Sequence, residues 1–431
     1  MSGKLLLNGS DYLMLGFDHE LRRLGYAGNS CQIILELGSS FPRARLEKRI
    51  LEVCSRWPIV RARPGGMFRP QWKPGRNGGP TPSVRVHRDQ EGLDQQLINE
   101  SLASDRGELL RFDLIEREGG GACRLMFSWA HALMDAPSAE YILALLGRED
   151  LQMPAEPRPA TNAPAAASRS KFSARVKLAW KTLYRIEKMG VKGPRSLGTR
   201  HSDAPRALGY RIERFSAEES KKVRDNAVRL CGLLGAAQFH AAASIVELDR
   251  LHKRLNKPSP SYVLPVPVGL RLKGAVEPIF SNQVTMLMTQ FLTEDSATVE
   301  RVATLLKGEM QEAMRTDMLE SGRVLSDLFR FLPRSPYMAV LKKGLGGEIC
   351  SLFYGDTAAV NPNLTTFLGA PILDFAHVAA ITPSPGIGVI FYYFQGALRV
   401  TVLHLLPILS PDEAAEFGLR LRKRLLEPGI V

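Results

Sequence analysis

The sequence has few cysteines and no pattern among them. The five cysteines stand singly among 431 residues, without a CxxC pair, at Cys31, Cys54, Cys123, Cys231 and Cys350. A disulfide framework needs an even set at regular spacing, and a zinc site needs ligands in short pairs. The eight histidines are equally dispersed, and neither HExxH nor HxxxH occurs. We therefore expect a reducing, cytoplasmic environment, no bound metal and no redox cofactor.

Long apolar runs are also missing. The N-terminus carries three leucines at 5–7 before polar residues, which is too short for a secretory signal. No segment approaches the ~20 apolar residues of a membrane span. With 45% apolar and 23% charged residues, the composition is that of a globular protein large enough for two lobes. We expect a soluble protein that contacts the inner membrane surface at most peripherally.

The net charge of +13 is concentrated in one segment. Residues 151–200 hold eleven Lys or Arg and two acidic residues, so they carry +9, and the other 381 residues carry only +4. A nucleic-acid-binding face would need basic residues spread over a folded surface with interleaved aromatics. We therefore expect no nucleic-acid partner.

Hydrophobic periodicity predicts a mixed α/β fold with two lobes. The strand-like segments are 30–37, 110–116, 124–130, 262–269, 284–291, 349–354, 388–394 and 398–405. The helical segments are 43–56, 138–146, 171–189, 216–227, 233–255, 297–315 and 412–426. Residues 64–82 are rich in Gly and Pro and predict a surface loop. Residues 151–170 form a Pro/Ala/Ser linker, so we divide the chain into a lobe at 1–150, a linker with a basic helix at 151–207, and a lobe at 208–431.

One candidate site stands out, at the end of a predicted strand. His131 follows the apolar Phe127-Ser128-Trp129, and Asp135 lies four residues further on, just before a predicted helix. A histidine at the end of a strand is held by rigid structure, and its ordinary pKa near 6.5 suits a general base. From these residues alone, a surface histidine followed by a helix N-cap aspartate is the favoured interpretation.

The surrounding pattern resembles the chloramphenicol-acetyltransferase-like superfamily, whose members include condensation domains of peptide synthetases, wax ester synthase/diacylglycerol acyltransferases and BAHD acyltransferases. Its HHxxxDG signature, minimally HxxxD, is similar to Ala130-His131-Ala132-Leu133-Met134-Asp135-Ala136. Further similarities occur in family order along the chain, at 56–62, 109–114, 266–271, 281–282 and 396–401. The resemblance implies a two-lobed fold with an active-site tunnel between the lobes.

The resemblance also implies the chemistry. His131 would be the general base for direct acyl transfer from a CoA or acyl-carrier thioester to a hydroxyl or amine, without an acyl-enzyme and without a cofactor. Asp135 and Arg271 would pair to hold the loop. Trp129, Ala136 and Asn282 are candidate channel-lining residues. A hydrophobic acyl chain is the expected donor group, and the acceptor a small molecule or lipid.

Two departures from the signature leave alternatives open. The first His and the Gly of the motif are Ala130 and Ala136, and no DFGWG occurs, which argues against the BAHD subgroup. One alternative is a stand-alone condensation enzyme that forms an amide between carrier-bound substrates. Another is a catalytically inactive member that acts as a binding module.

The basic segment contains an amphipathic helix. At about 100° per residue, the apolar side chains between 171 and 189 share one arc, namely Phe172, Val176, Ala179, Trp180, Leu183 and Ile186. The basic side chains lie on the opposite side, at Lys171, Arg175, Lys177, Lys181, Arg185 and Lys188. Three interpretations stay open: packing on the protein's own lobe, contact with a membrane surface, or docking of an acidic acyl carrier protein.

Overall fold

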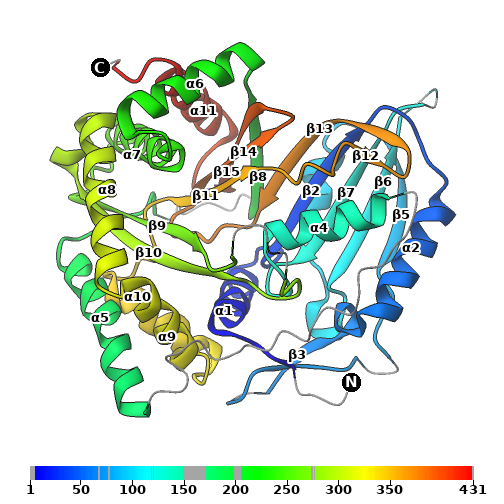
Figure 1. The fold of residues 1–431 in the computed structure, drawn as a ribbon, viewed down its shortest axis with the longest axis horizontal. Helices are drawn as coiled ribbons and strands as arrows, with labels where there is room; N and C mark the ends of the chain where they lie inside the picture. The colour runs from blue at the N-terminus through cyan, green and yellow to red at the C-terminus, as the bar shows by residue number, and fades with distance from the viewer. Residues whose placement is uncertain are drawn as a thin grey trace.

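A computed structural model describes residues 5–66, 68–75, 78–117, 119, 121–148, 171–198, 205–272, 275 and 277–429. Figure 1 shows two lobes side by side, each built on a β-sheet with helices packed against it. The linker predicted at 151–170 lies outside the described residues. The fold is therefore mixed α/β with two lobes, as the sequence predicts.

The larger sheet has six strands, most of them from the first 130 residues. In spatial order they are β12 (Thr366–Phe367), β13 (Ala370–Ala379), β2 (Ser30–Leu37), β7 (Cys123–Ala130), β6 (Leu110–Glu116) and β5 (Ser83–Arg88). β2 and β7 are buried along almost their whole length, which explains their nearly continuous apolar sequence. The rings of Phe112, Phe127 and Trp129 stack in that order, with centroids 4.8 and 5.6 Å apart, and this aromatic column runs toward the end of β7.

Helices and a small sheet complete this lobe. The helices are α2 (Arg43–Arg56), α3 (Leu93–Ile98) and α4 (Ala136–Gly147), and the small sheet has the order β1 (Leu5–Leu6), β4 (Gln71–Lys73), β3 (Arg63–Gly65). α2 buries Leu46, Ile50, Val53 and Cys54, at the spacing of one helical face. α4 is apolar on nearly every side because it is buried on nearly every side.

The second lobe contains a four-stranded sheet and a long hairpin. The sheet has the order β11 (Phe353–Ala359), β14 (Ile387–Phe394), β15 (Ala397–Leu406), β8 (Ala207–Arg214), and the hairpin is β9 (Ser261–Gly269) and β10 (Val284–Leu292). Against the sheet pack α6 (Ala217–Cys231), α7 (Ala236–Arg254) and α11 (Pro411–Leu426). Beside the hairpin lie α5 (Phe172–Val191), α8 (Val299–Arg315), α9 (Met318–Phe329) and α10 (Arg334–Gly344).

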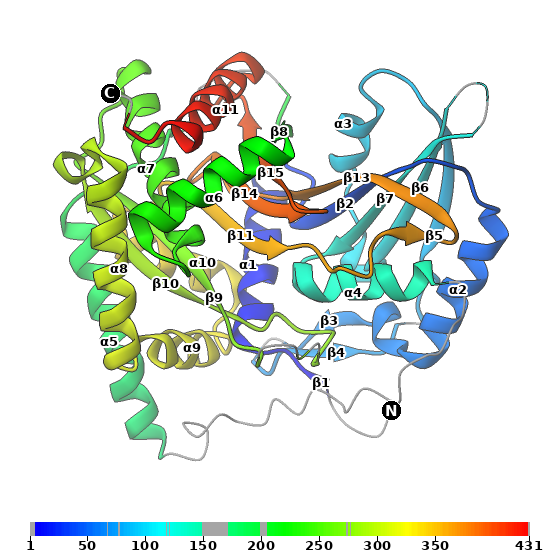
Figure 2. The same cartoon turned by 45° about the horizontal axis from the view of Figure 1, so that its top comes forward.

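Segments that are distant in the sequence join the two lobes. β13 pairs antiparallel with β2, with Ala379 opposite Cys31, so a C-terminal strand completes the larger sheet. Glu140 of α4 makes a second connection. Its carboxylate accepts a hydrogen bond from the N–H of Asn361, and its Oε1 atom lies 2.8 Å from the Nε2 atom of His377 on β13. α1 (Gly9–Arg23) lies between the lobes and contacts α9 and α10 (Figure 2).

Several sequence expectations need correction. The helix α1 and the strand β13 were not predicted, and the expected loop at 64–82 contains β4 and part of β3. The helix expected at 233–255 begins at Ala236, because Gly232 adopts a φ of 87° and turns the chain after α6. The strand expected at 349–354 begins only at Phe353. Among the described residues no single helix combines the length and apolarity of a membrane span; α6 and α7 do so only together, and they meet at a bend of 93°.

The apolar arc predicted for the basic helix does not pack as one face. α5 buries Ala179 and Ile186, together with Thr182 and Met189, in contact with α9. The larger apolar side chains of the same arc, Phe172, Val176 and Trp180, are exposed. Packing on the protein's own lobe therefore accounts for only part of the predicted apolar face.

The start of α1 generates a prediction of stability. Gly9 lies against α9, its N–H donates to the Asp327 carboxylate at 2.9 Å, and a Cβ at this position would overlap the backbone of Ser326 and Asp327. Replacing Gly9 with Ala should reduce the free energy of unfolding by about 1–3 kcal/mol, the usual penalty of overpacking. Gly308→Ala in α8, where a Cβ meets no atom within 4 Å, is the matched control and should be neutral or stabilising. Denaturant midpoints measure both, and equal midpoints would contradict the close packing of α1 on α9.

Candidate functional site

His131 lies in a tight turn between β7 and α4. Side chains alternate along a strand, so His131 follows Phe127 and Trp129 on the same face. Its N–H donates to the carbonyl of Asn29 at 3.1 Å, and the Trp129 indole donates to the carbonyl of Met134 at 3.0 Å across the turn. His131 as a residue is half-buried, and its Nδ1 atom is buried and has no hydrogen-bond partner within the described parts of the chain. These two hydrogen bonds hold the turn at both ends. The Nδ1 atom of the imidazole does not contribute to holding it.

Asp135 closes the turn and begins α4. One carboxylate oxygen, Oδ1, caps the helix by accepting the N–H of Ser138 at 3.2 Å. The other, Oδ2, accepts Arg271 Nη1 at 2.5 Å and the N–H of Gln283 at 3.0 Å. Both oxygens are therefore engaged by the helix and by the β9–β10 connection, which suits a carboxylate that positions the turn.

Arg271 ties the β9–β10 connection to this turn. Besides Asp135, its guanidinium donates from Nη2 to Ser138 Oγ at 2.8 Å and to the Pro278 carbonyl at 2.9 Å. The planar fork of an arginine can make such contacts in several directions at once, which a lysine cannot. The structure thus brings together Asp135 and Arg271, which the sequence analysis paired, across the boundary between the lobes.

A second connection reaches the main chain of His131. Asn282 donates from Nδ2 to the His131 carbonyl at 2.9 Å. The carboxylate of Asp11 on α1 accepts both the N–H of Asn282, at 2.7 Å, and its Nδ2, at 3.0 Å. Burial raises the pKa of Asp11 to about 7, although the hydrogen bonds from Asn282 and Asn8 oppose this shift. The sequence analysis missed Asp11; its only local sign was the Asn8–Asp11 spacing of a helix capping box.

Cys31 is a further neighbour that the sequence analysis did not single out. It lies opposite Trp129 in the β2–β7 ladder, so it shares a sheet face with His131 and is its diagonal neighbour. Its thiol is buried and forms no disulfide. Burial lowers the pKa of His131, but the Cys31 side chain, the histidine's own carbonyl and the charge of Asp135 together outweigh burial and raise the pKa to about 9.

The remaining predicted site residues fall into two groups. Trp129 and Asn282 are buried within the scaffold of the turn, and Ala136, the first residue of α4, is half-buried. Their role in lining a channel stays a prediction. The six basic residues lie on α5, in the other lobe: Lys171, Arg175, Lys177, Lys181, Arg185 and Lys188.

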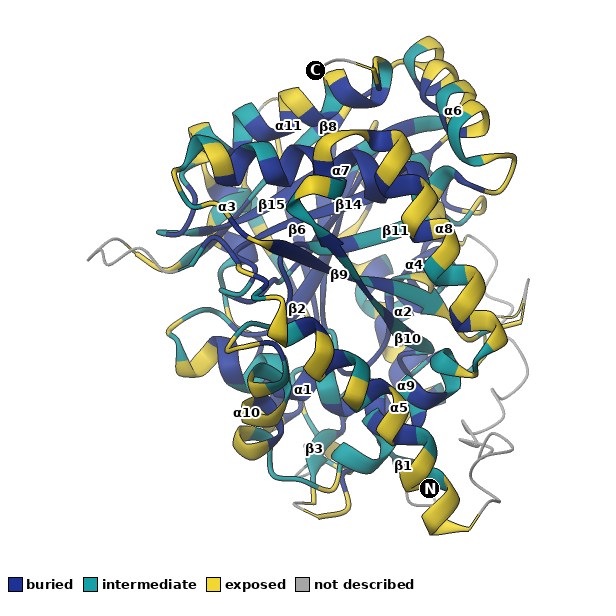
Figure 3. Ribbon diagram, turned by 90° about the vertical axis from the view of Figure 1, so that its left-hand side faces the viewer, coloured by how far each residue is buried: buried dark blue, intermediate teal, exposed yellow. Residues whose placement is uncertain are grey.

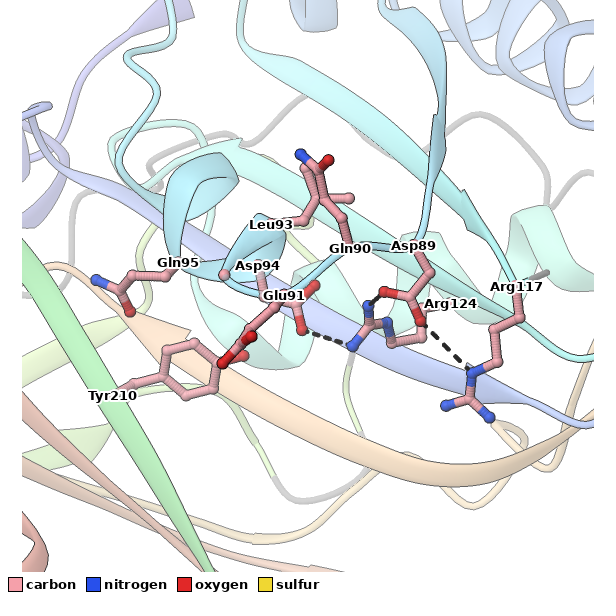
Figure 4. Close-up of a pocket in the computed structure, with 10 residues that line it drawn as sticks. Asp89, Gln90, Glu91, Leu93, Asp94, Gln95, Arg117, Arg124 and Tyr210 are labelled. Carbon is pink, nitrogen blue, oxygen red and sulfur yellow. Dashed lines mark hydrogen bonds and ion pairs between the residues drawn. The ribbon is translucent and has the colours of Figure 1, made fainter.

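A cavity that opens to the described surface lies elsewhere. It measures about 700 Å³ and is lined by residues 89–95, Arg117, Arg124 and Tyr210 (Figure 4). Arg124 donates to Asp94 at 2.9 Å and also pairs with Asp89, while Arg117 lies 3.8 Å from Asp89, so carboxylates already match both charges. Arg124 is seven residues before His131 along β7, roughly 23 Å in a strand. This cavity therefore lies at a different place from His131.

The described residues contain no group of three His, Cys, Asp or Glu side chains that could hold a metal ion. The groups at the turn are the imidazole of His131, the thiol of Cys31 and a network of hydrogen bonds that fixes the backbone around them. Such an arrangement can move a proton and position a reactant.

Breaking the contact between Asp135 and Arg271 should destabilise the protein. Asp135→Ala removes the helix cap and leaves the Arg271 guanidinium, 12% exposed, without its carboxylate. We expect a loss of roughly 3–5 kcal/mol in the free energy of unfolding, the usual cost of removing one partner of a buried pair. Asp225→Ala, which breaks the exposed pair with Lys221, is the control and should cost less than about 1 kcal/mol. If both variants unfold at the same denaturant concentration, Asp135 does not hold the turn as described.

Comparisons with known proteins give structural relatives only. No protein-family model matches the chain, and no curated protein matches it. The first condensation domain of the calcium-dependent antibiotic synthetase superimposes with a TM-score of 0.72 at 16% identity, covering 100% of this chain and 99% of that one.

Two further solved structures extend the comparison. TRI3 trichothecene 15-O-acetyltransferase from Fusarium sporotrichioides has a TM-score of 0.70 at 12% identity, with 98% and 95% of the two chains covered. The starter condensation domain of rhizomide synthetase, solved with C8-CoA and Leu-SNAC, has a TM-score of 0.63 at 15% identity, with 99% and 95% covered. The resemblance found in the sequence is therefore confirmed at the level of the fold: the chain has the two-lobed chloramphenicol-acetyltransferase-like fold of condensation domains and of an acetyltransferase.

Proposed function

We propose that the protein is an acyltransferase that moves an acyl group from a thioester to a hydroxyl or amine, with His131 as general base. The observation that carries this proposal is the turn at the end of β7. Its backbone is fixed by Asn29, Asn282 and Asp135, and the imidazole of His131 has a buried Nδ1 atom that these contacts leave free. The shared fold supports the proposal, because the structural relatives include condensation domains and an acetyltransferase.

In the proposed reaction His131 takes the proton of the acceptor as the acceptor oxygen or nitrogen attacks the thioester carbonyl. A C–O or C–N bond forms, the C–S bond breaks, and the imidazolium returns the proton to the leaving thiolate. No acyl-enzyme forms, and no metal or redox cofactor takes part. Because both substrates must meet at one imidazole, much of the acceleration would come from positioning in a tunnel between the lobes.

The donor is an acyl-CoA or an acyl group on a carrier protein, with a hydrophobic chain as the first choice. One structural relative was solved with C8-CoA, and the condensation domains of the comparison favour an amide-forming enzyme as the second candidate. A single change distinguishes both enzymatic candidates from an inactive binding module, because only the enzymes depend on the imidazole of His131.

Replacing His131 with Ala should reduce turnover sharply and change stability little, because the Nδ1 atom of His131 has no hydrogen-bond partner among the described residues and so does not hold the turn. Loss of a general base typically costs about 10²–10⁴-fold in rate. Thiol release from acyl-CoAs of several chain lengths, with alcohol and amine acceptors, measures the effect. His19→Ala, a helix-surface histidine that lies 2.9 Å from Ser335, is the control and should retain full activity. A folded His131→Ala variant with full activity on CoA or carrier donors would remove His131 from the mechanism.

The raised pKa of His131 predicts an unusual pH profile. A base acts in its unprotonated form, so kcat/KM should rise with pH, reach half its maximum near the pKa of about 9 and level off above it. Cys31→Ala removes a group that raises this pKa, so the rise should move to lower pH while the plateau rate changes little. Cys350→Ala, which removes a buried thiol next to Ser351, the residue that binds Val263 of β9, is the control and should leave the profile in place. A midpoint near 6 in both the wild type and Cys31→Ala would contradict the role assigned to Cys31.

A further inference from the structure

α5 carries an apolar ridge that no described part of the chain covers. Phe172, Val176, Trp180 and Tyr184 follow one another at four-residue spacing, which forms a continuous row on a helix surface. Their side chains are 70%, 42%, 58% and 50% exposed. The adjoining side of the helix, with Ala179, Thr182, Ile186 and Met189, is buried. We call the four exposed residues the α5 ridge.

Basic side chains border the α5 ridge. At 100° per residue, Lys177, Lys181 and Lys188 follow directly after the ridge around the helix, on the side away from the buried residues. Lys188 Nζ lies 4.6 Å from the centre of the Tyr184 ring, so ridge and lysines adjoin. Within α5 the one acidic residue is Glu187, which leaves the helix strongly basic.

The ridge is convex and extends to the end of the helix. Between Phe172 and Lys177 every residue but Arg175 is exposed, so the first turns of α5 project from the lobe. In Figure 3 the yellow bands of exposed residues continue along α5 toward its N-terminal end. A folded protein partner would need a groove shaped to this ridge, whereas a fluid lipid surface accepts a convex apolar ridge without a preformed groove.

We propose that the α5 ridge docks this protein on an anionic lipid surface. Tryptophan and tyrosine favour the boundary between lipid headgroups and acyl chains, because one end of each ring system is apolar and the other polar. Lysines beside them keep their ammonium groups in the headgroup layer while their stems cover apolar surface. Each lysine near an anionic surface strengthens binding by about fivefold. An interfacial helix typically combines an apolar face, aromatic residues and adjoining cations, and α5 has all three.

The exposed Trp180 can serve as an intrinsic fluorescent probe of this contact. Of its four tryptophans, Trp57, Trp72 and Trp129 are 5%, 6% and 1% exposed, whereas Trp180 is 58% exposed. Acrylamide should therefore quench mainly Trp180 in the free protein. Weak quenching would mean that another part of the chain or a second copy covers the ridge, and that result would overturn the proposal.

The test adds full-length protein to vesicles of phosphatidylcholine with or without phosphatidylglycerol. Sedimentation measures the bound fraction, and the fluorescence of Trp180 should shift to the blue and resist acrylamide only with anionic vesicles. Phe172→Ser combined with Val176→Ser should lower the partition coefficient at least tenfold while it keeps the probe. Lys177→Gln with Lys188→Gln should lower it similarly and weaken its dependence on salt. Leu373→Ser with Leu419→Ser, exposed leucines elsewhere on the surface, is the matched control and should bind as the wild type does.

Equal binding to both kinds of vesicle, no binding, or a blue shift only with an acidic carrier protein would each overturn the proposal. The measurement does not need turnover, so its result is independent of the proposed acyl transfer. His131→Ala should bind vesicles as well as the wild type, which separates failure of docking from failure of catalysis.

Discussion

The candidate site depends on one buried ion pair, between Asp135 and Arg271. The carboxylate begins α4 and ends the turn of His131, and the guanidinium holds the β9–β10 connection of the other lobe. The pair restricts both elements, because a turn at the end of a strand and a long connection otherwise have many alternative conformations. The pair therefore determines where the turn lies relative to the second lobe, and with it any reactant that contacts both lobes.

Around this pair, the structure separates the groups that hold the turn from the group that can react. Asn282 binds the carbonyl of His131, Asn29 accepts its N–H, and Asp11 orients Asn282 from α1. These contacts use only the main chain of His131. The imidazole adjoins Cys31 on the same sheet face, and that neighbour changes its proton affinity without fixing the backbone. Cys31 thus affects the proton affinity alone, whereas Asp135 both holds the turn and, through its charge, raises the pKa of His131.

The extent to which the sequence predicts this structure follows from how local each interaction is. β2, α2 and β6 coincide with their predicted bounds. Their burial can be read from the pattern of apolar residues within each segment, which is a local signal. Arg271 was found through a short motif. By contrast, β13 joins a sheet through β2, more than 330 residues earlier, and Asp11 acts through a loop 271 residues away, so no local pattern identifies either. On α5, periodicity located the apolar arc correctly but could not tell which part of it would be covered.

The two alanines that depart from the HHxxxDG pattern do not weaken the candidate base. Ala130 is the last residue of β7, and alternation places its side chain on the sheet face opposite that of His131. The hollow beside Ala130 and Ala132 measures about 10 Å³, so that side of the turn is filled and has no room for a second imidazole. Ala136 begins α4 with helical backbone, where no left-handed φ requires glycine. Both substitutions thus leave the geometry of His131 intact, and they are no argument for an inactive binding module over an acyltransferase.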